Sequence, residues 1–318
     1  MSEKTYYDLI ILGAGPAGMT AAVYAARKQI DVLVISENVG GQTTWSAEIE
    51  NYLGFRFITG PELVAKFEDH VSKFNVPRVF SKVIKLTRPG HTFSIETEDG
   101  RTFAARAVIV ATGKSPRLLD VPGEKQYMGR GVTYCATCDG PLFAGKNVLV
   151  AGGGNSGLDA VVQLMKICPK VYLVERESEL RADAVMIERA RKAPNVEILT
   201  DTAVVEIAGD AFVNAVTVRN LKGGEMRRLE VEGVFVEIGL VPNSDFVKGM
   251  LRLNPIGEIP VDCASRTGIP GLYAAGDVTD VPDKQIIIAA GDGAKAALGA
   301  YSYIVRLPAG DDWHRTPA

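Results

Sequence analysis

Short apolar runs alternate along the chain with longer helix-forming segments. Residues 9–12 are an uninterrupted apolar run, Leu-Ile-Ile-Leu, that ends at a glycine-rich turn. Runs without alternating polar positions are typical of strands buried on both faces of a parallel sheet. Residues 17–28, rich in alanine and free of proline, predict a helix. Residues 32–35 are the next apolar run, with Glu37 just past its end, so this region predicts a β–α–β unit.

The same order of elements returns in the middle of the chain. Residues 147–151 and 171–174 predict two more buried strands, and Glu175 follows the second of them. Residues 158–167 predict the helix between these strands. The chain is therefore expected to contain two copies of one α/β plan.

An alternating segment and a further buried run follow each copy. Residues 83–105 alternate apolar and polar positions around a tight-turn signal at 99–100. Residues 204–231 do the same around the Lys-Gly-Gly sequence at 222–224. Each alternating segment predicts a β-hairpin. The apolar runs that return to the sheet are residues 107–113 and 233–239.

The last part of the chain has no counterpart in the second copy. A strand-like run at 271–277 precedes an apolar helix that starts at Gln285. The simplest topology returns this tail to the first copy and makes the second an insertion, with linkers near Leu118 and at 241–243. We expect two Rossmann-like, three-layer nucleotide-binding domains, the second inserted into the first. The expected boundaries are 1–117 with 245–318 for one domain and 118–244 for the other.

Composition narrows the class of protein. The 318 residues exceed what one core usually holds, and 47% hydrophobic with 23% charged residues is ordinary for a globular protein. A net charge of −3 provides no basic field for nucleic acid or acidic lipid. No apolar run approaches the roughly 18 residues of a membrane span, and the N-terminus lacks a signal-peptide layout. We therefore expect a cytoplasmic protein with neither nucleic acid nor membrane as partner.

Two glycine fingerprints follow the first strand of each copy. They are Gly13-Ala14-Gly15-Pro16-Ala17-Gly18 and Gly152-Gly153-Gly154-Asn155-Ser156-Gly157. The first glycine permits a tight turn, the second lets the backbone approach a pyrophosphate, and the third lets helix pack on strand. An acidic residue about 20 positions further on is expected to bind a ribose. Glu37 and Glu175 meet that expectation, so the chain predicts two dinucleotide sites.

The charges near the second fingerprint bear on the choice of nucleotide. Glu175 and Glu177 flank Arg176, and Arg181 lies a few residues on. Carboxylates accept hydrogen bonds from ribose hydroxyls and repel a 2′-phosphate. The pattern favours NADH, whereas the two arginines keep NADPH open as the alternative.

The sequence Cys135-Ala136-Thr137-Cys138-Asp139 lies just before the second fingerprint. Two small intervening residues allow the sulfurs to close a disulfide, and such pairs commonly contain a thiol of lowered pKa. The adjacent carboxyl group of Asp139 is a candidate proton donor. We therefore predict a redox-active dithiol.

The other cysteines and the histidines are assigned no chemistry. Structural zinc needs four ligands, and Cys168 and Cys263 stand alone, so no metal site is predicted. Both are interpreted as small buried apolar groups. His70, His91 and His314 lie in no motif and are interpreted as structural or surface groups.

Taken together, these motifs resemble those of the low-molecular-weight thioredoxin reductase family, over about residues 5–306. The motifs that carry the resemblance, in order, are the first fingerprint, Gly40-Gly41-Gln42, Glu50-Asn51, Thr59-Gly60-Pro61-Glu62, Ala111-Thr112-Gly113, Cys-Ala-Thr-Cys-Asp and Gly276-Asp277 with Lys284-Gln285-Ile286. Other stretches are similar to the reductase part of the alkyl hydroperoxide reductase flavoprotein. These include residues 154–157, 181–183, 235–243 and 284–288.

The resemblance implies FAD at the first fingerprint and a nicotinamide nucleotide at the second. The residues implied for FAD are Gly13, Gly15, Pro16, Ala17, Gly18, Glu37, Gly41, Gln42, Asn51, Ala111, Thr112, Gly113, Gly276, Asp277, Lys284, Gln285 and Ile286. Those implied for NADH or NADPH are Gly152, Gly154, Asn155, Ser156, Gly157, Glu175, Arg176, Arg181, Ile238 and Gly239. The family usually has a His and an Arg at the positions of Glu175 and Glu177, which is a departure.

The resemblance also implies a catalytic sequence. Cys138 is expected to face the flavin, Cys135 to exchange with a partner disulfide, and Asp139 to donate the proton. One domain is expected to rotate against the other, and the protein to be a homodimer. The resulting hypothesis is an NADH-preferring, FAD-dependent reductase of a thioredoxin- or glutaredoxin-like dithiol protein.

Three alternatives remain open from the sequence. One is a peroxide-system flavoprotein reductase or NADH oxidase, with a peroxiredoxin or oxygen as acceptor. Another is a reductase supplied by a non-nicotinamide donor such as ferredoxin. The third is a flavin-bound redox sensor with little turnover.

Overall fold

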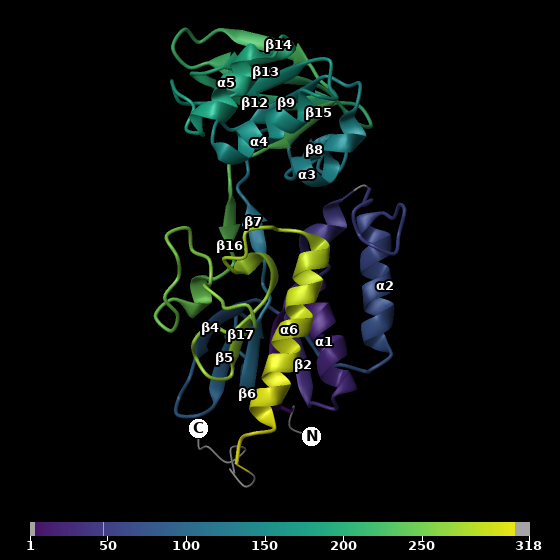
Figure 1. Ribbon diagram of the computed structural model, residues 1–318, viewed down its shortest axis with the longest axis vertical. Coiled ribbons are helices and arrows are strands. Elements are labelled where there is room, and N and C mark those ends of the chain that lie inside the picture. The colour runs from purple at the N-terminus through teal and green to yellow at the C-terminus, as the bar shows by residue number, and fades with distance from the viewer. Residues whose placement is uncertain (1–3, 47, 309–318) are drawn as a thin grey trace.

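The computed structural model describes residues 4–46 and 48–308. Two lobes lie one above the other along the long axis of the molecule (Figure 1). The N/C lobe contains both the first strand and the last helix of the chain, and the inserted lobe is formed by the middle of the chain. The expected α/β fold, with one Rossmann-like domain inserted into another, is confirmed.

The sheet of the N/C lobe has the order β3-β2-β1-β6-β5-β4, and β17 pairs with β6. Its strands are β1 (Tyr6–Ala14), β2 (Val32–Val39), β3 (Arg78–Phe80), β4 (Val83–Thr87), β5 (Phe93–Thr97), β6 (Thr102–Val110) and β17 (Leu272–Ala274). β1, β2, β3, β6 and β17 are parallel, whereas β4, β5 and β6 form an antiparallel meander. Residues 9–12 are fully buried, which confirms the interpretation of their apolar run.

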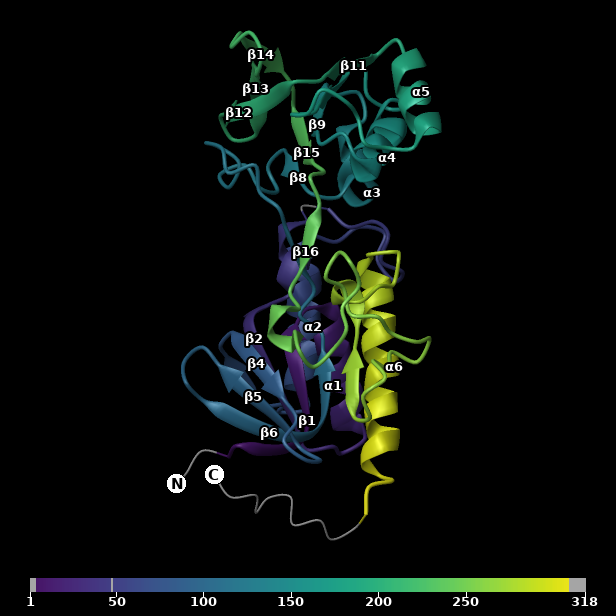
Figure 2. The ribbon, with the colours of Figure 1, turned by 90° about the vertical axis from the view of Figure 1, so that its left-hand side faces the viewer.

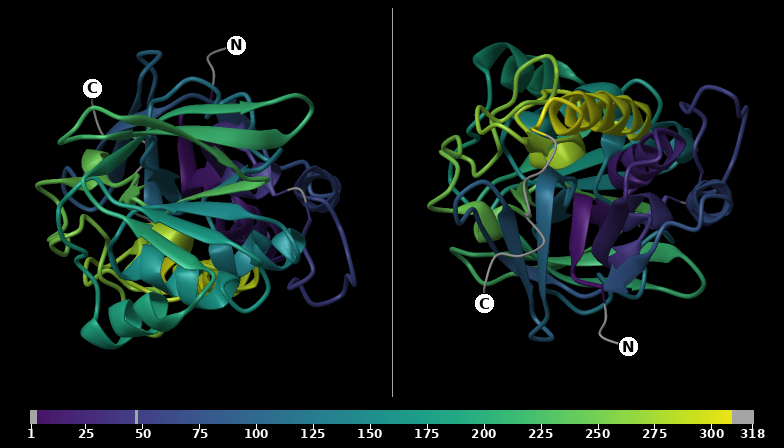
Figure 3. Two further views of the ribbon diagram at one scale, coloured as in Figure 1. Left: turned by 90° about the horizontal axis from the view of Figure 1, so that it is seen from above. Right: turned by 90° about the horizontal axis from the view of Figure 1, so that it is seen from below.

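Three helices complete the N/C lobe: α1 (Pro16–Arg27), α2 (Gly60–Ser72) and α6 (Ile286–Ile304). Thr59 begins α2 through a reciprocal pair of hydrogen bonds with Glu62, a capping box. α6 lies against α1 on one face of the sheet (Figure 3). The tail of the chain therefore returns to the first domain, as the sequence predicts.

The inserted lobe has a parallel sheet of order β11-β10-β9-β15-β8 and a three-stranded antiparallel sheet, β12-β13-β14. Their bounds are β8 (Val132–Thr133), β9 (Val148–Ala151), β10 (Val171–Val174), β11 (Val196–Leu199), β12 (Thr202–Gly209), β13 (Val213–Asn220), β14 (Met226–Glu230) and β15 (Gly233–Val236). The helices are α3 (Ala136–Asp139), α4 (Asn155–Leu164) and α5 (Ala184–Lys192). α4 and α5 lie on the opposite side of the lobe from β12–β14 (Figure 2).

Two short strands connect the lobes. β7 (Lys114–Pro116) and β16 (Leu240–Pro242) pair antiparallel, and they form the narrow waist of the molecule (Figures 1 and 2). We call this pair the linker ribbon. The chain crosses between lobes near the positions expected from the sequence, while the domain boundaries at 117/118 and 244/245 stay a prediction.

Four short 3-10 segments complete the elements: η1 (Gly41–Trp45), η2 (Gly140–Phe143), η3 (Asp245–Val247) and η4 (Gly276–Val278). None of the helices in the described parts of the chain combines the length and the apolar character needed to cross a bilayer.

Two expected element bounds are wrong. The helix predicted at 158–167 spans Asn155–Leu164, because the last residues of the fingerprint already form its first turn. Pro169 then excludes a long continuation. Glu37 lies within β2 rather than after it, since β2 continues to Val39.

Candidate functional site

The first fingerprint has the geometry that its three glycines predict. Gly13 has a φ of +109° at the turn out of β1, a conformation that favours glycine. A Cβ on Gly18 would collide with the carbonyl oxygen of Gly13, so this glycine lets α1 pack against the strand. No atom lies within 4 Å of where a Cβ of Gly15 would be. The backbone at Gly15 is therefore open to a ligand at the N-terminus of α1.

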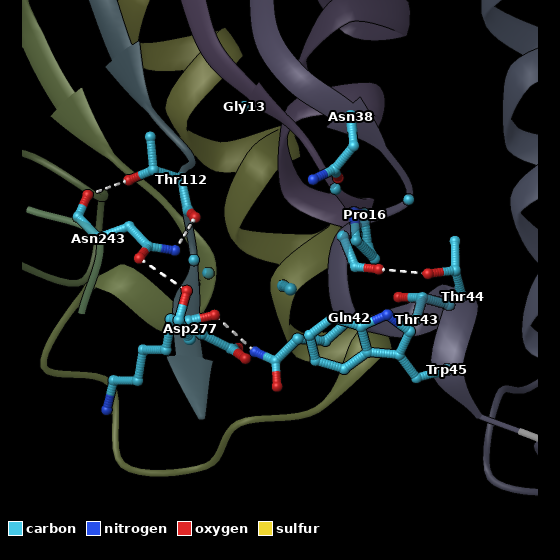
Figure 4. A pocket seen from close by; sticks show the side chains of 18 of the residues that line it. Gly13, Pro16, Asn38, Gln42, Thr43, Thr44, Trp45, Thr112, Asn243 and Asp277 are labelled. Carbon is cyan, nitrogen blue, oxygen red and sulfur yellow. Dashed lines mark hydrogen bonds between the residues drawn. The ribbon is translucent and has the colours of Figure 1, made fainter. Parts of the chain in front are cut away.

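A cavity of about 980 Å³ extends from this fingerprint to the dithiol. Figure 4 shows Asn243 and Asp277 on one side of it and Pro16 and Trp45 on the other. Every residue that the resemblance implies for FAD lines the cavity except Gly18, which packs behind the turn. Cys135, Cys138 and Asp139 line it as well. The size and open glycine of this cavity fit a bound dinucleotide.

Hydrogen bonds join segments far apart in sequence around the cavity. The Gln42 side chain donates from Nε2 to the carbonyl oxygen of Lys114 at 2.9 Å. Asn51 donates from Nδ2 to Oε1 of Gln285 at 3.1 Å, which links the start of the chain to the entry of α6. These bonds orient two of the polar side chains expected near the flavin.

A buried charge cluster that the sequence did not predict lies at this cavity. Lys114 Nζ is 2.5 Å from Glu258 Oε1, with the two side chains 7% and 8% exposed. Lys284 Nζ is 3.2 Å from the same oxygen. Burial alone would raise the pKa of Glu258, but hydrogen bonds from Lys114 and other neighbours hold it below its ordinary value. Burial raises the pKa of the nearby Asp277 carboxyl, against the opposing effect of the two lysines.

Cys135 and Cys138 form a disulfide, with their Cα atoms 5.3 Å apart. Cys135 immediately precedes α3. Its Sγ accepts a hydrogen bond from the backbone N–H of Cys138 at 3.2 Å. The predicted dithiol is therefore present as a closed pair at the cavity wall.

Asp139, the next residue, is held against the same wall. The hydroxyl of Thr133 donates to its Oδ2, and its Oδ1 is buried without a hydrogen-bond partner among the described residues. Burial raises the pKa of Asp139; the negative charge of Glu48 adds to this, and the Thr133 hydrogen bond opposes it. A buried carboxyl group with a raised pKa next to a disulfide is consistent with the predicted proton donor.

The second fingerprint repeats the geometry of the first. Gly152 has a φ of +121°, and a Cβ on Gly157 would collide with the carbonyl oxygen of Gly152. No atom lies within 4 Å of a Cβ position on Gly154, so the start of α4 is open. The residues implied for the nicotinamide nucleotide are not among those that line the large cavity. In this arrangement the disulfide, rather than the second fingerprint, faces the first.

The carboxylate of Glu175 binds the backbone beside this fingerprint. It accepts hydrogen bonds from the N–H groups of Gly153 at 2.5 Å and Glu177 at 2.9 Å. The backbone N–H of Arg181 donates to the carbonyl oxygen of Gly153 at 2.9 Å. The Arg181 and Glu177 side chains form an exposed ion pair at 3.7 Å. The Glu175 carboxylate is therefore fixed against the backbone of the second fingerprint, whereas the Glu177 carboxylate is at the surface.

The two remaining cysteines differ. Cys168 is buried, donates from Sγ to the carbonyl oxygen of Phe143 at 3.2 Å, and has a pKa raised to about 11 by burial. Cys263 is exposed, so its interpretation as a buried group is wrong. Its position in a polar turn, where Asp262 accepts the N–H of Ala264, explains the difference.

The histidines and metal chemistry add little to the site. His70 and His91 are exposed, and His314 lies outside the described residues. Among the described residues, no group of three or more histidine, cysteine, aspartate or glutamate side chains is arranged to hold a metal ion.

Glu237 is a further residue at the site that sequence reasoning did not select. Its Oε1 accepts a hydrogen bond from the backbone N–H of Ala136 at 3.2 Å, within the Cys-Ala-Thr-Cys sequence. Burial raises the pKa of Glu237 to about 7; Asp159 contributes to this, and the Ala136 N–H opposes it. An available signal was its place directly after a buried parallel strand, at the sheet edge where ligands bind.

Comparisons with known proteins agree with this geometry. The chain is 43% identical over 97% of its length to an alkyl hydroperoxide reductase subunit of Pseudomonas putida. It is 42% identical over 96% of its length to NADH dehydrogenase of Bacillus subtilis (strain 168). The chain spans about 60% of the length of each of these curated relatives.

Solved structures match over nearly their whole length. Thioredoxin reductase from Streptococcus pyogenes MGAS5005 superposes with a TM-score of 0.90 at 40% identity, covering 95% of this chain and 99% of that one. The FR conformation of Lactococcus lactis thioredoxin reductase gives a TM-score of only 0.65 at 39% identity, covering 95% and 100%.

The family model described as pyridine nucleotide-disulphide oxidoreductase matches residues 7–294. FAD and a nicotinamide nucleotide are the cofactors that this family implies, and the two fingerprints and the disulfide fit them. The chain therefore belongs to the pyridine nucleotide-disulphide oxidoreductase family.

Proposed function

We propose that this chain reduces protein disulfides with electrons from NADH, through FAD and its own Cys135–Cys138 pair. The observation that carries the proposal is the single cavity lined both by the first fingerprint and by the disulfide. Bound FAD would supply the conversion of a hydride from nicotinamide into the two electrons that open a disulfide.

The chain's own residues bind, orient and transfer protons. Gly15 and the first turn of α1 would hold the pyrophosphate of FAD, and Gln42 and Asn51 would line its ring region. Cys138 is the sulfur proposed to face the ring. Asp139 protonates the sulfur that leaves when the disulfide opens. Cys135 then attacks the disulfide of the partner protein.

Rotation of the inserted lobe about the linker ribbon is part of the proposal. The disulfide lines the cavity while the residues implied for nicotinamide do not, so the two need different lobe arrangements to reach one ring. Two solved structures of nearly equal identity to this chain superpose on it with TM-scores of 0.90 and 0.65. The lower value belongs to the structure titled FR conformation. A different relative placement of two otherwise similar lobes would lower the TM-score in this way, which supports such a rotation.

NADH is the proposed electron donor. The Glu175 carboxylate is hydrogen-bonded to the backbone at the second fingerprint, and the Glu177 carboxylate lies two residues on. Two carboxylates there would repel a 2′-phosphate, which supports the proposal. The relative named NADH dehydrogenase is consistent with this charge argument. NADPH, with Arg176 or Arg181 as its phosphate partner, is the alternative.

The proposed partner is a thioredoxin- or glutaredoxin-like dithiol protein, and the proposed assembly is a homodimer. A second candidate is the reductase step of a peroxide-reducing system. It is favoured by the 43% identity to the alkyl hydroperoxide reductase subunit of Pseudomonas putida. Its acceptor would be a dithiol module or a peroxiredoxin rather than free thioredoxin.

Turnover of the purified flavoprotein with NADH and NADPH, each against thioredoxin-like proteins and a peroxiredoxin, tests the proposal. We expect NADH-driven reduction of at least one thioredoxin-like protein, and little oxygen consumption without it. Efficient transfer to the peroxiredoxin alone would favour the second candidate. Oxygen consumption at the full rate without any protein acceptor would favour an NADH oxidase. Absence of any reduction by NADH or NADPH would overturn the proposal.

A further inference from the structure

Two carboxyl groups lie at the short helix that carries the disulfide: Asp139 is the last residue of α3, and Glu237 directly follows the end of β15. Thr133 on β8 holds Asp139 by a hydrogen bond, and Thr133 pairs with Phe235 on β15. Two residues after Phe235, at the end of β15, Glu237 accepts the N–H of Ala136. That N–H belongs to the peptide bond that joins Cys135 to Ala136. Asp139 is the proposed proton donor, whereas Glu237 has no role in the proposed reaction steps.

We propose that Glu237 is a positioning residue that couples reduction of the Cys135–Cys138 disulfide to uptake of a proton by its own carboxyl group. The coupling rests on the proposed function for its electron source in the enzyme, but its physical basis is local. Glu237 is hydrogen-bonded to the Ala136 N–H, next to Cys135 in the chain. Opening the disulfide adds negative charge at a thiolate of this segment, and a like charge disfavours the ionised carboxylate.

The charges around Glu237 favour this behaviour. Asp159 on α4 disfavours its ionised form, and Asp139 lies on the same short helix as the disulfide. The Ala136 N–H is the group that favours ionisation. Because burial and Asp159 hold the pKa of Glu237 near 7 with the disulfide closed, a modest further rise is enough to protonate it at neutral pH.

The step balances with one added proton. The S–S bond of Cys135–Cys138 breaks as two electrons enter; one sulfur takes a proton and the other stays a thiolate. Glu237 takes a further proton from solvent when the pH lies between its pKa values in the closed and opened states. In that window the equilibrium constant for reduction falls more steeply as the pH rises than it would with one proton alone. The additional fall is up to tenfold per pH unit, which corresponds to about 30 mV in the reduction potential of a two-electron couple.

The test measures the potential of the dithiol itself. The full-length flavoprotein is equilibrated with mixtures of reduced and oxidised dithiothreitol from pH 6 to pH 9. Alkylation and mass spectrometry then give the fraction of Cys135–Cys138 that is reduced. No nicotinamide turnover is needed, so failure of the proposed reductase activity leaves this measurement interpretable, and the reverse also holds.

Glu237→Gln keeps a side-chain oxygen for the Ala136 N–H but cannot titrate. We expect it to match the wild type at pH 6, where the carboxyl is protonated in both states. At pH 8 we expect reduction to be easier in the variant, on the order of tenfold in the equilibrium constant. Glu232→Gln, an exposed position at the opposite end of β15, is the matched control and should follow the wild type throughout.

Equal curves for Glu237→Gln and the wild type would overturn the proposal. An equal offset at pH 6 and pH 8 would do so too, since a structural effect does not depend on titration. Asp159→Asn, at an exposed position on α4, tests the same coupling if the first variant does not fold. In the wild type, the plot of the logarithm of the reduction equilibrium constant against pH should change slope at the pKa of Glu237. Asp159→Asn should move this change of slope to lower pH, because Asp159 raises that pKa. A change of slope that stays in place would contradict the assignment to Glu237.

Discussion

The hydroxyl of Thr133 donates a hydrogen bond to one carboxylate oxygen of Asp139, and the other oxygen is buried without a partner among the described residues. The Asp139 carboxyl is therefore fixed in orientation yet poorly solvated. Burial raises its pKa, and the Thr133 hydrogen bond is the interaction that opposes the rise. This arrangement favours the protonated form of the carboxyl group more than full exposure to solvent would.

Asp139→Asn should slow electron exchange between the reduced flavin and the disulfide by about 100-fold, the lower range for loss of a general acid. In the wild type this rate should fall as the pH rises through the raised pKa of Asp139, because the donor is then ionised. The variant should lack that dependence while its NADH affinity stays nearly intact. Rapid-reaction absorbance traces between pH 5 and 9 measure these rates.

Thr133→Val is the companion variant for this prediction. Removing the hydrogen bond that lowers the pKa of Asp139 should extend the active range to higher pH. Unchanged traces in Asp139→Asn would assign Asp139 a structural role only.

Cys138→Ser should retain bound FAD but lose disulfide reduction, since the cavity is intact and the sulfur is not. Flavin absorbance and turnover with a protein disulfide measure the two effects separately. Cys263→Ser removes an exposed thiol outside the site and should keep wild-type turnover. Full activity in Cys138→Ser would exclude the dithiol from the electron path.

Glu177→Arg should shift nucleotide preference toward NADPH by about tenfold in the ratio of kcat/KM values. The change removes a carboxylate beside the expected 2′ position and frees Arg181 from its ion pair. A charge-assisted bond to phosphate contributes about 1.5–3 kcal/mol, which exceeds the 1.4 kcal/mol of a tenfold change. Glu179→Arg makes the same charge change at an exposed position two residues on. An equal shift in both variants would mean that only net charge matters.

Lys114→Met should destabilise the protein by about 1–3 kcal/mol in the free energy of unfolding. Removing one partner of a buried ion pair commonly costs about 3–5 kcal/mol, but Lys284 remains beside Glu258 and offsets part of this loss. Denaturant unfolding of the apoprotein, without FAD, measures the effect. The double variant Lys114→Met/Glu258→Gln should be more stable than the sum of the single effects predicts. Strict additivity would show that the pair is not coupled.

The pH dependence of the same cluster has a defined sign. The pKa of Glu258 is lowered in the folded protein, so its contribution to stability is present above the ordinary glutamate pKa. That contribution is lost as the pH falls through the lowered value. In Glu258→Gln, the decline of stability in acid should therefore be shallower than in the wild type, as unfolding curves between pH 3 and 7 would measure.

The sequence predicted the fold well because the main signals are local. The buried run at residues 9–12 and the spacing of Gly13, Gly15 and Gly18 depend on the next few residues only. The return of the tail to the first domain followed from an unmatched element count, and the pairing of β17 with β6 agrees with it. Element ends were less certain, since β2 continues through the polar residue Glu37.

The residues that were missed depend on contacts between distant segments. Lys114 and Glu258 are 144 positions apart, and nothing near either one predicts a buried partner. Glu237 and Ala136 are 101 positions apart, so the burial of this carboxyl follows from how β15 meets α3. Cys263 was misassigned because the apolar character of cysteine predicts burial, whereas its polar turn places it at the surface.

The pairing of Pro116 with Leu240 brings together the points where the chain enters and leaves the inserted lobe. A segment whose two ends lie side by side can be removed, and the gap can be closed with a short turn without stretching the remaining chain. In the proposed function, the residues that choose the nucleotide and the redox-active cysteines both lie on this segment. Exchanging it between relatives would transfer both traits at once, while the flavin-binding scaffold stays unchanged.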